Sequence, residues 1–413
     1  MTGGDQNGDH WSVHTDVSVL LPADMSFEYH MMEYRWCAIE VTSPALWVSD
    51  ESWEEIRAVV RALRDEYWLL TPDTAGLHFH YGNGKSYIPF GKLRRMAALL
   101  LAVDPIMAQL HPEDRRWNDY CLSNRLYSRI AHGRPAADAA RDIGVEYVEE
   151  EPEFPSTTQR RPEPASRPFR RRTADLIVPF KRGTLKGYTF HPDTFGSLEI
   201  LTVLADNDSE GSAHTDDSSR AEPTTRAENK APLAIPYAVR EILQCLNAPT
   251  VAELMRHSPF DAYRLAYNFH AYKHDRYKKM IKENGEIVAE YQHKRTIEFR
   301  QMASTMEPDE VVAHGKVAVR LCEFAAEADL EELWRIVLDC TVAEVHGDWY
   351  DVFDLLAELG LNDEARVLQY SVAWFRGETI PDVIIDDEEE VAGEEAERGS
   401  EWLKWLCGFA TCC

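Results

Sequence analysis

Three short segments of the chain alternate apolar and polar residues with a period of two, which is the pattern of a half-buried strand. They read CAIEV at 37–41, GLHFHY at 76–81 and RTIEFRQ at 295–301. Successive side chains of a strand point to opposite faces, so each segment has one apolar face and one polar face. The residues on the polar faces are Glu40, His78, His80, Glu298 and Arg300. If the three strands belong to one sheet, these five side chains point into a single concavity.

Apolar residues recur at helical spacing between and after these strands. Ser49 or Asp50 is the expected N-cap of the first helix, and Gly360 is the expected stop between the last two. The segments with helical patterning are 50–66, 91–110, 234–272, 308–326, 330–340 and 350–376. A further strand is expected in the alternating stretch that begins at Trp11. Strands and helices joined by short connections are typical of an α+β or an α/β domain.

Two polar stretches interrupt this pattern. Residues 149–175 are rich in proline and arginine, and residues 205–232 have almost no large apolar side chains. Neither can bury enough apolar surface to offset the entropy of ordering, so both are predicted to be flexible. The expected organisation is a disordered leader at 1–10, a first domain part at 11–148, a linker at 149–175, a strand-rich segment at 176–204, a disordered insertion at 205–232, a second domain part at 233–380, and an acidic tail with a hydrophobic, cysteine-containing end at 381–413.

The formal charge of −27 argues against a general nucleic-acid binder and against a protein of anionic membranes. No apolar run is long enough for a membrane span, and the polar start has no signal-peptide pattern. Eight scattered cysteines without a C-x-x-C pair suit a reducing compartment. We therefore expect a cytoplasmic protein. The basic run Arg170–Arg172 is interpreted as part of a solvated linker, with a nuclear address as the alternative. The oligomeric state is left open.

The polar faces of the strands have the chemistry of a phosphoryl-transfer site. Carboxylate oxygens together with imidazole nitrogens bind Mg²⁺ or Mn²⁺, and an arginine beside them can hold a phosphate. The chain has neither a G-x-x-x-x-G-K-[ST] loop nor a kinase-type glycine-rich loop, so any nucleotide is held in another way. The structural alternatives are hydrogen-bonded strand histidines and a surface ion pair between Glu298 and Arg300. Arg115 follows a helix end, where it either contacts an anion or caps a loop.

Two of these segments resemble signatures of one family. GLHFHYGNG, at 76–84, resembles CGLHVHVG, and KRTIEFRQMAST, at 294–305, resembles TIEFRQ-x-x-GT, both signatures of the amidoligase family described in fungi. Further similar stretches follow the family's order over about 11–130 and 232–376. The family is similar to glutamine synthetase and glutamate–cysteine ligase, which are carboxylate–amine ligases. The resemblance implies an α+β fold in which a curved, mostly antiparallel sheet with flanking helices cradles ATP and divalent metal ions.

The resemblance also implies roles for the polar residues. ATP would phosphorylate a small-molecule or peptide carboxylate, and an amine would attack the acyl phosphate. The implied metal ligands are Glu40, His78, His80 and Glu298, and the implied catalytic residues are Arg300 and Glu298. The implied cofactor-binding residues are His78, His80 and Arg300, and Arg115 is added to them as the candidate anion contact at the helix end. Arg300 would hold the transferred phosphate, with Mg²⁺ or Mn²⁺ stabilising the charge on its oxygens.

The start of the chain departs from the family pattern. The family opens with a strand carrying Glu-x-Glu, and this chain has only a short polar leader before Trp11. The expectation is therefore a truncated or impaired ligase, with a catalytically inactive binding or scaffold relative as the alternative. A cupin-like metal oxygenase also uses His-x-His on a strand. It ranks below both because Gly82, Asn83 and Gly84 follow the pair where a cupin has a further carboxylate.

Overall fold

The computed structural model describes residues 10–20, 36–145, 180–185, 187, 232–257, 264–273 and 295–378. The chain divides into two compact units. Unit 1 comprises 1–77, 303–314 and 373–413, and unit 2 comprises 78–302 and 315–372. The predicted linker at 149–175, nearly all of the predicted insertion at 205–232 and the predicted tail at 381–413 lie outside the described residues.

Unit 1 contains a two-stranded antiparallel sheet and a helix. Strand β1 (Ser12–Thr15) pairs with β2 (Ile39–Thr42), and His14 lies opposite Glu40. Helix α1 (Asp50–Glu66) begins where the side chain of Ser49 accepts a hydrogen bond from the backbone N–H of Ser52, so the sequence-predicted helix and its cap are confirmed. Within the same unit, Arg57 of α1 forms an ion pair with Asp309 at 2.6 Å.

Unit 2 holds most of a three-stranded sheet with the order β3-β5-β4. The strands are β3 (Gly76–Gly82), β5 (Thr296–Ala303) and β4 (Tyr267–Asn268). Strand β4 runs antiparallel to β5, and Asn268 lies opposite Glu298. At the end of β3, a Cβ atom on Gly82 would lie 2.8 Å from Cγ2 of Thr296. A side chain at this position would therefore displace the Thr296 side chain.

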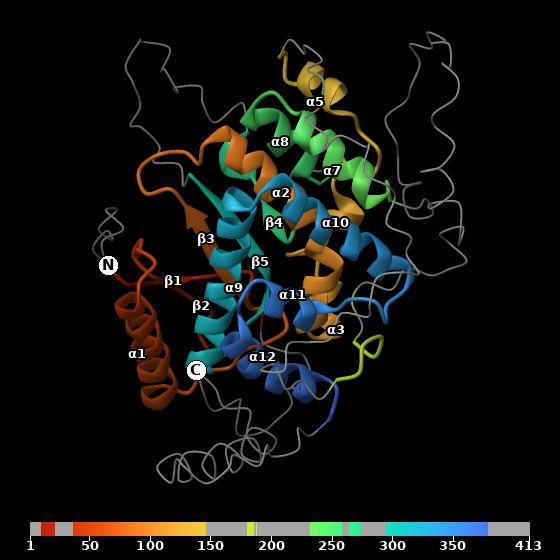
Figure 1. Cartoon of the computed structure of the whole chain (residues 1–413). Coiled ribbons are helices and arrows are strands. Elements are labelled where there is room, and N and C mark those ends of the chain that lie inside the picture. The colour runs from red at the N-terminus through yellow and green to blue at the C-terminus, as the bar shows by residue number, and fades with distance from the viewer. Residues whose placement is uncertain are drawn as a thin grey trace, which may run out of the picture. The chain divides into compact units, whose positions relative to one another are not determined.

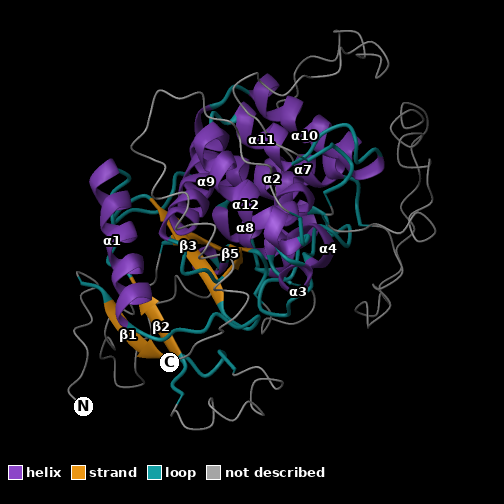
Figure 2. Ribbon diagram, turned by 90° about the horizontal axis from the view of Figure 1, so that it is seen from below, coloured by secondary structure: helices purple, strands orange, loops and turns teal. Residues whose placement is uncertain are grey.

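A helical core packs around α2 (Phe90–Met107), whose residues 96–107 are all buried. A helix buried on every side belongs to the interior of a domain, and Figure 1 shows α2 among α7, α8 and α10. Figure 2 shows β3 and β5 beside the helices. The other helical elements are η2 (Ala108–Leu110), α3 (Glu113–Arg116), α4 (Asn124–Tyr127), α5 (Ala136–Asp142), α7 (Ile235–Gln244), α8 (Ala248–Met255), η5 (His270–Tyr272), α9 (Pro308–Glu327), α10 (Leu330–Val345), α11 (Val352–Glu358) and α12 (Asn362–Phe375).

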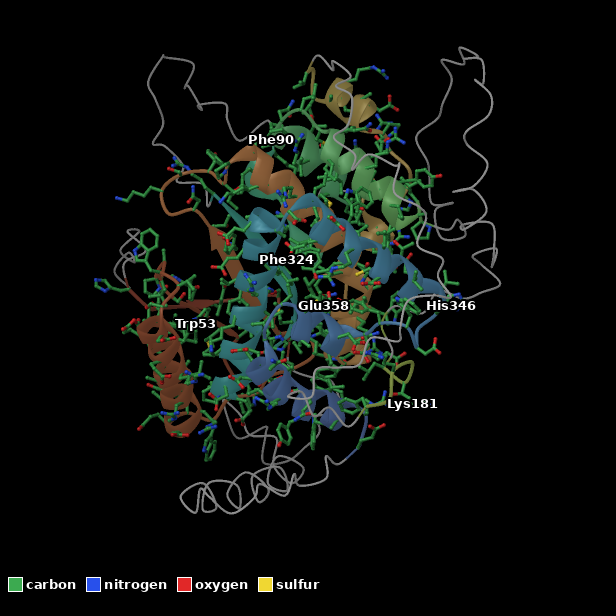
Figure 3. All side chains as sticks on the ribbon, in the orientation of Figure 1. Trp53, Phe90, Lys181, Phe324, His346 and Glu358 are labelled. Atoms are coloured by element: carbon green, nitrogen blue, oxygen red, sulfur yellow. The ribbon has the colours of Figure 1, made fainter. Side chains whose placement is uncertain are left out.

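The helices of unit 2 also form ion pairs at the edge of their packing. Glu358, labelled in Figure 3 at the end of α11, forms an ion pair with Arg335 of α10, with Oε2 and Nη1 3.2 Å apart. Lys316 of α9 donates to Glu364 of α12 at 2.9 Å. Among the described residues, no helix combines the length and the hydropathy needed to cross a membrane.

The fold class is α+β, with small antiparallel sheets that do not close, as the sequence predicts. Three details of the prediction are wrong. The strand expected from Trp11 onward is only the four residues of β1. The segment 234–272, predicted to be helical, also contains β4 and η5. The sequence pattern did not reveal β4 because a strand of two residues is too short to show a period of two. Finally, Glu40 lies in the β1–β2 sheet, so the five polar residues do not share one sheet.

Gly360 ends α11 with φ +76°, a left-handed conformation that costs about 1 kcal/mol for a residue with a Cβ atom. The next backbone N–H, that of Leu361, donates to the carbonyl of Leu356 at 2.8 Å and closes the helix end. We expect Gly360→Ala to lower the free energy of unfolding by about 1 kcal/mol, measured by urea denaturation. The matched control is Gly91→Ala in the first turn of α2, where an added Cβ atom would have nothing within 4 Å and φ is ordinary. Equal effects of both changes would contradict the explanation.

Candidate functional site

The two histidines of β3 face the carboxylate of Glu298 on the neighbouring strand β5. Oε1 of Glu298 lies 4.0 Å from Nδ1 of His78 and 3.9 Å from Nε2 of His80. On β5, Ile297 and Phe299 are fully buried on the opposite face. The strand alternation read from the sequence therefore brings these three polar residues together, as predicted.

Arg300 and Asn268 hold the two oxygens of Glu298. Nη1 of Arg300 lies 2.5 Å from Oε1, and Nδ2 of Asn268 donates to Oε2 at 2.6 Å. The guanidinium of Arg300 also donates through Nε to the carbonyl of Tyr120 at 3.0 Å. On the other side, Nδ1 of His80 lies 3.0 Å from the hydroxyl of Thr296. We call His78, His80, Glu298, Arg300 and Asn268 the carboxylate cluster.

In the carboxylate cluster, the two histidines are more exposed than the ion pair of Glu298 and Arg300. The side chains of Glu298 and Arg300 are 16% and 15% exposed, whereas those of His78 and His80 are 27% and 30% exposed. An ion pair this shielded is not the surface pair that the structural alternative assumed. The two imidazole rings thus lie beside the Glu298 carboxylate, whose oxygens bind the Arg300 guanidinium and the Asn268 amide.

Burial and the neighbouring charges set the protonation states of the cluster. Burial, reinforced by the charge of Arg300, lowers the pKa of His78 to about 3 despite the opposing pull of Glu298. Burial by itself would raise the pKa of Glu298, but Arg300, the two histidines and the Asn268 hydrogen bond outweigh it and hold the pKa at about 2. At neutral pH the cluster therefore contains an ionised carboxylate and a neutral His78 imidazole, which has a lone pair to offer.

Arg115 supports β5 from within the core. Its side chain is 2% exposed, and its guanidinium donates to the carbonyls of Met302 at 3.1 Å and Arg300 at 2.7 Å. The sequence interpretation had Arg115 contacting a cofactor. In the structure these two hydrogen bonds join Arg115 to the β5 backbone next to Arg300, and its predicted contact with a cofactor stays a prediction.

Asp104, on the buried helix α2, was missed by the sequence analysis. Its Oδ1 accepts from Gln301 on β5 at 3.1 Å, and its Oδ2 accepts from the backbone N–H of Arg125 at 2.9 Å and from the hydroxyl of Ser123. Gln301 in turn accepts from the Tyr267 hydroxyl at 3.3 Å. The available signal was a single acid inside a long apolar helix segment, which must be hydrogen-bonded when it is buried.

The cluster has the donor types of a Mg²⁺ or Mn²⁺ site, a carboxylate and imidazoles. Bonds of about 2.1 Å place neighbouring ligand atoms about 3 Å apart, which is closer than the 3.9 and 4.0 Å between Glu298 and the histidines. In the part of the chain that the structure describes, no three His, Cys, Asp or Glu side chains are grouped so that they could hold a metal ion. The residue types thus fit such an ion, but the distances in the described arrangement do not, because Glu298 is paired with Arg300.

Glu40, the remaining predicted ligand, lies on β2 in unit 1, where His14 of β1 is its cross-strand neighbour. The alternation rule places it on the polar side of a strand but carries no information on which sheet that strand joins. Its predicted role as a metal ligand stays a prediction.

Comparison with known families gives a match to the first part of the chain. The family model described as "Putative amidoligase enzyme" matches residues 3–152. That segment contains both histidines of the cluster and lies before Glu298 and Arg300 in the chain. No curated protein and no solved structure matches the chain. Over residues 3–152, less than half of its length, the chain is thus similar to an amidoligase family, which indicates a ligase-type function.

Proposed function

We propose that this protein is an ATP- and divalent-metal-dependent carboxylate–amine ligase that forms an amide through an acyl phosphate. The observation that carries the proposal is the convergence of His78 and His80 on Glu298, with Arg300 bound to the same carboxylate. The amidoligase match over residues 3–152 supports the reaction class. The substrates would be a small-molecule or peptide carboxylate and an amine, and the protein would act in the cytoplasm. We also propose that the protein is related to glutamine synthetase.

The proposal assigns a role to each residue of the cluster. Arg300 is the cation available to the oxygens of a transferred phosphoryl group, because guanidinium donors match phosphate geometry. Glu298 and the imidazoles of His78 and His80 are the residues that would hold Mg²⁺ or Mn²⁺, with Glu40 as a further proposed ligand. When bound, such an ion neutralises the negative charge of the phosphoryl oxygens. Asn268 keeps the Glu298 carboxylate in a fixed orientation.

A second candidate is a catalytically inactive amidoligase-like binding or scaffold protein. It is favoured by the engagement of both Glu298 oxygens, one by Arg300 at 2.5 Å and one by Asn268 at 2.6 Å. A carboxylate held in this way is already neutralised by the protein. In this candidate the same face would bind a ligand without turnover.

Trapping of the acyl phosphate tests the proposal. The full chain is incubated with Mg·ATP, hydroxylamine and a panel of amino acids and short peptides, and hydroxamate and ADP are measured together. We expect equal amounts of the two products from the parent. Glu298→Gln and Arg300→Ala should each lower the rate by at least about 100-fold, because the first removes a proposed metal ligand and the second removes the cation proposed to bind the phosphoryl oxygens. Calorimetry with Mg·ATP should show affinity losses of about tenfold or more.

The control variant is Arg366→Gln on α12, which removes one positive charge from an exposed pair with Asp363. It should behave as the parent does. Binding of Mg·ATP by the parent that is lost in both cluster variants, without ADP or hydroxamate, would identify the inactive candidate. Equal Mg·ATP binding by the parent and both variants would show that the cluster is structural and would refute both candidates.

A further inference from the structure

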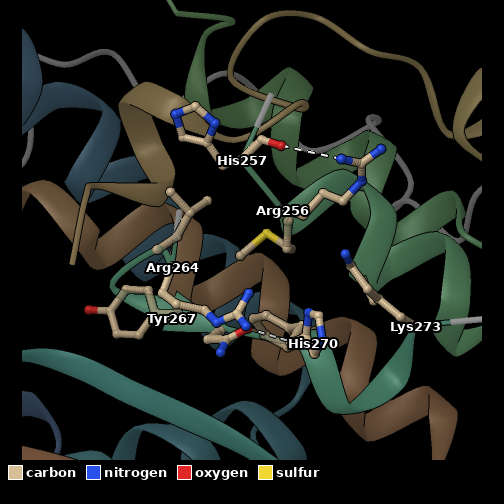
Figure 4. A pocket seen from close by; sticks show the side chains of 11 residues that line it. Arg256, His257, Arg264, Tyr267, His270 and Lys273 are labelled. Carbon is tan, nitrogen blue, oxygen red and sulfur yellow. Dashed lines mark hydrogen bonds between the residues drawn. The ribbon is translucent and has the colours of Figure 1, made fainter. Parts of the chain in front are cut away.

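The pocket between the C-terminal end of α8 and the segment 264–273 adjoins the carboxylate cluster. Asn268 is part of its lining (Figure 4). The Nδ2 of Asn268 donates to Glu298 at 2.6 Å, and its Oδ1 accepts from the backbone N–H of His270 at 2.9 Å. This pocket therefore belongs with the site already described. A separate contact surface in unit 2 is built on α11.

A short segment of unit 2 lies against helices that are distant from it in the chain. It comprises residues 180–185 and 187, which we call the anchor segment, and Figure 3 labels its Lys181. Its described contacts are with α11, with the residues just before α11 and with the end of α2. The stretches on either side, 149–175 and 205–232, are predicted from their composition to be flexible. The contacts of the anchor segment itself therefore decide where it lies.

Two apolar side chains hold the anchor segment in place. Phe180 is 6% exposed and stacks on Phe353 of α11, with ring centroids 5.8 Å apart and an angle of 21° between the ring planes. Leu185 is 7% exposed. Burial of apolar area and the geometric preference of an aromatic pair both favour this position of the segment. By contrast, Lys181 and Thr184, which lie between these two residues in the chain, are exposed.

An ion pair with two hydrogen bonds joins the anchor segment to α11. Nε of Arg182 donates to Oδ2 of Asp354 at 2.7 Å, and Nη2 donates to Oδ1 at 2.5 Å. The two side chains are 12% and 5% exposed, so the pair is largely shielded from water. Paired donors of this kind select arginine, because a lysine ammonium cannot present two parallel N–H groups to a carboxylate.

Gly187 brings the backbone of the anchor segment against the end of α2. A Cβ atom at this position would clash with the carbonyl oxygen of Pro105 and would lie 3.5 Å from Cγ of Gln109. The carbonyl belongs to the backbone of a buried helix and has little room to move, so a larger residue would push the segment away from α2. The anchor segment thus has four recognised positions, which are Phe180, Arg182, Leu185 and Gly187.

The surface that receives these positions is held together by its own hydrogen bonds. Asp351 caps α11, and its Oδ1 accepts from the backbone N–H groups of Phe353 at 3.0 Å and Asp354 at 3.2 Å. The side chain of Gln109 accepts from the backbone N–H of Val352 at 2.8 Å and so ties η2 to α11. Because neither set of bonds involves the anchor segment, the surface can form before the segment binds to it, which lowers the entropy cost of binding.

We propose that this surface of α11 and α2 is a peptide-binding groove, and that the anchor segment is a docking motif that occupies the groove in cis and exchanges in and out of it. A few recognised positions separated by exposed ones are typical of a short peptide bound to a preformed groove. The motif reads F-x-R-x-x-L-x-G. The inference is independent of the ligase proposal, because none of these residues belongs to the carboxylate cluster.

A labelled peptide of residues 178–189, added to the full chain, tests whether the groove recognises the motif. A tethered segment acts at an effective concentration on the order of 1 mM, so the parent chain should not bind the free peptide at up to about 0.1 mM. The chain variant Phe180→Ala/Arg182→Gln has a weakened motif in cis. It should bind the peptide saturably and at least about tenfold more tightly than the parent chain does. Fluorescence anisotropy measures both affinities.

Substitutions in the peptide test the four recognised positions. With the Phe180→Ala/Arg182→Gln chain as receptor, the peptide variants Phe180→Ala, Arg182→Gln, Leu185→Ala and Gly187→Ala should each bind at least about tenfold more weakly than the parent peptide. The matched control is the Lys181→Gln peptide, which loses the same charge as the Arg182→Gln peptide at an exposed neighbouring position. Its affinity should change by less than about twofold.

Cooperative thermal unfolding of the Phe180→Ala/Arg182→Gln chain shows that it folds. If it does not fold, the single variant Arg182→Gln, which keeps the buried Phe180, takes its place and should also bind the peptide more tightly than the parent chain does. Equal peptide binding by the parent chain and the folded variant would overturn the proposal. An equal loss of affinity in the Lys181→Gln and Arg182→Gln peptides would also overturn it, because the attraction would then be one of charge alone.

Discussion

The parent protein should gain stability relative to its Asp104→Asn variant, by about 3 kcal/mol, as the pH falls from 7 to about 3. Burial raises the pKa of Asp104 from 3.8 to about 6, although hydrogen bonds from Ser123, Arg125 and Gln301 oppose the shift. A carboxyl group with a raised pKa in the folded state binds its proton more tightly there than in the unfolded chain. Protonation therefore favours folding, and each pKa unit corresponds to about 1.4 kcal/mol.

The pH window follows from the two pKa values. The contribution of Asp104 is fully present below the unfolded pKa of 3.8 and is lost as the pH rises through about 6. An asparagine has nothing to titrate, so the difference between parent and variant isolates this group from the histidines, which titrate in both proteins. Urea denaturation of both proteins over a series of pH values gives the measurement. Parallel pH profiles would show that Asp104 is solvated in the folded protein.

Replacing Arg125 with methionine should lower the free energy of unfolding by about 3–5 kcal/mol, the largest loss we expect from a single substitution here. The Arg125 side chain is almost fully buried, and its guanidinium holds Glu344 of α10 through two hydrogen bonds of 2.6 and 3.2 Å. Glu344 is 12% exposed, so loss of its partner leaves a carboxylate with little access to water. Urea denaturation at neutral pH measures the change.

The double variant Arg125→Met/Glu344→Leu separates the two sources of this loss. It removes both charges, and apolar side chains of similar size should restore most of the stability. Arg366→Gln serves as the control, because its exposed ion pair with Asp363 should be worth less than about 1 kcal/mol. A double variant as unstable as Arg125→Met alone would mean that the loss comes from packing and not from an unpaired charge.

Asp104 and Arg125 connect the core with the carboxylate cluster. The backbone N–H of Arg125 and the side chain of Gln301 bind the same carboxyl group, that of Asp104. Gln301 directly follows Arg300 on β5, and Arg115 binds the carbonyl of Arg300 at 2.7 Å. The position of Arg300 beside Glu298 thus depends on buried polar contacts as well as on strand pairing. A substitution of Asp104 that leaves the free energy of unfolding unchanged would therefore report on how this contact positions Arg300.

Much of the local structure was predictable because its causes lie within a few residues. The Ser49 cap, the stop at Gly360 and the faces of β3 and β5 each follow from side-chain geometry over one turn or one strand. The same alternation predicted that His78 and His80 share a face, and the structure shows both near Glu298. Local periodicity is sufficient for these features, since no distant residue is needed to produce them.

The sequence by itself determined which side chains stand on the polar faces of the strands, and tertiary structure decided which strands meet. Strand β3 pairs with β5, which is distant in the chain, while β2 pairs with β1, so Glu40 joins a different sheet from Glu298. The contact of Asn268 with Glu298 depends on a two-residue strand without a recognisable pattern. The burial of Arg115 and Asp104 likewise depends on packing from distant segments. Alternation is a property of one strand, whereas pairing and burial are properties of the folded whole.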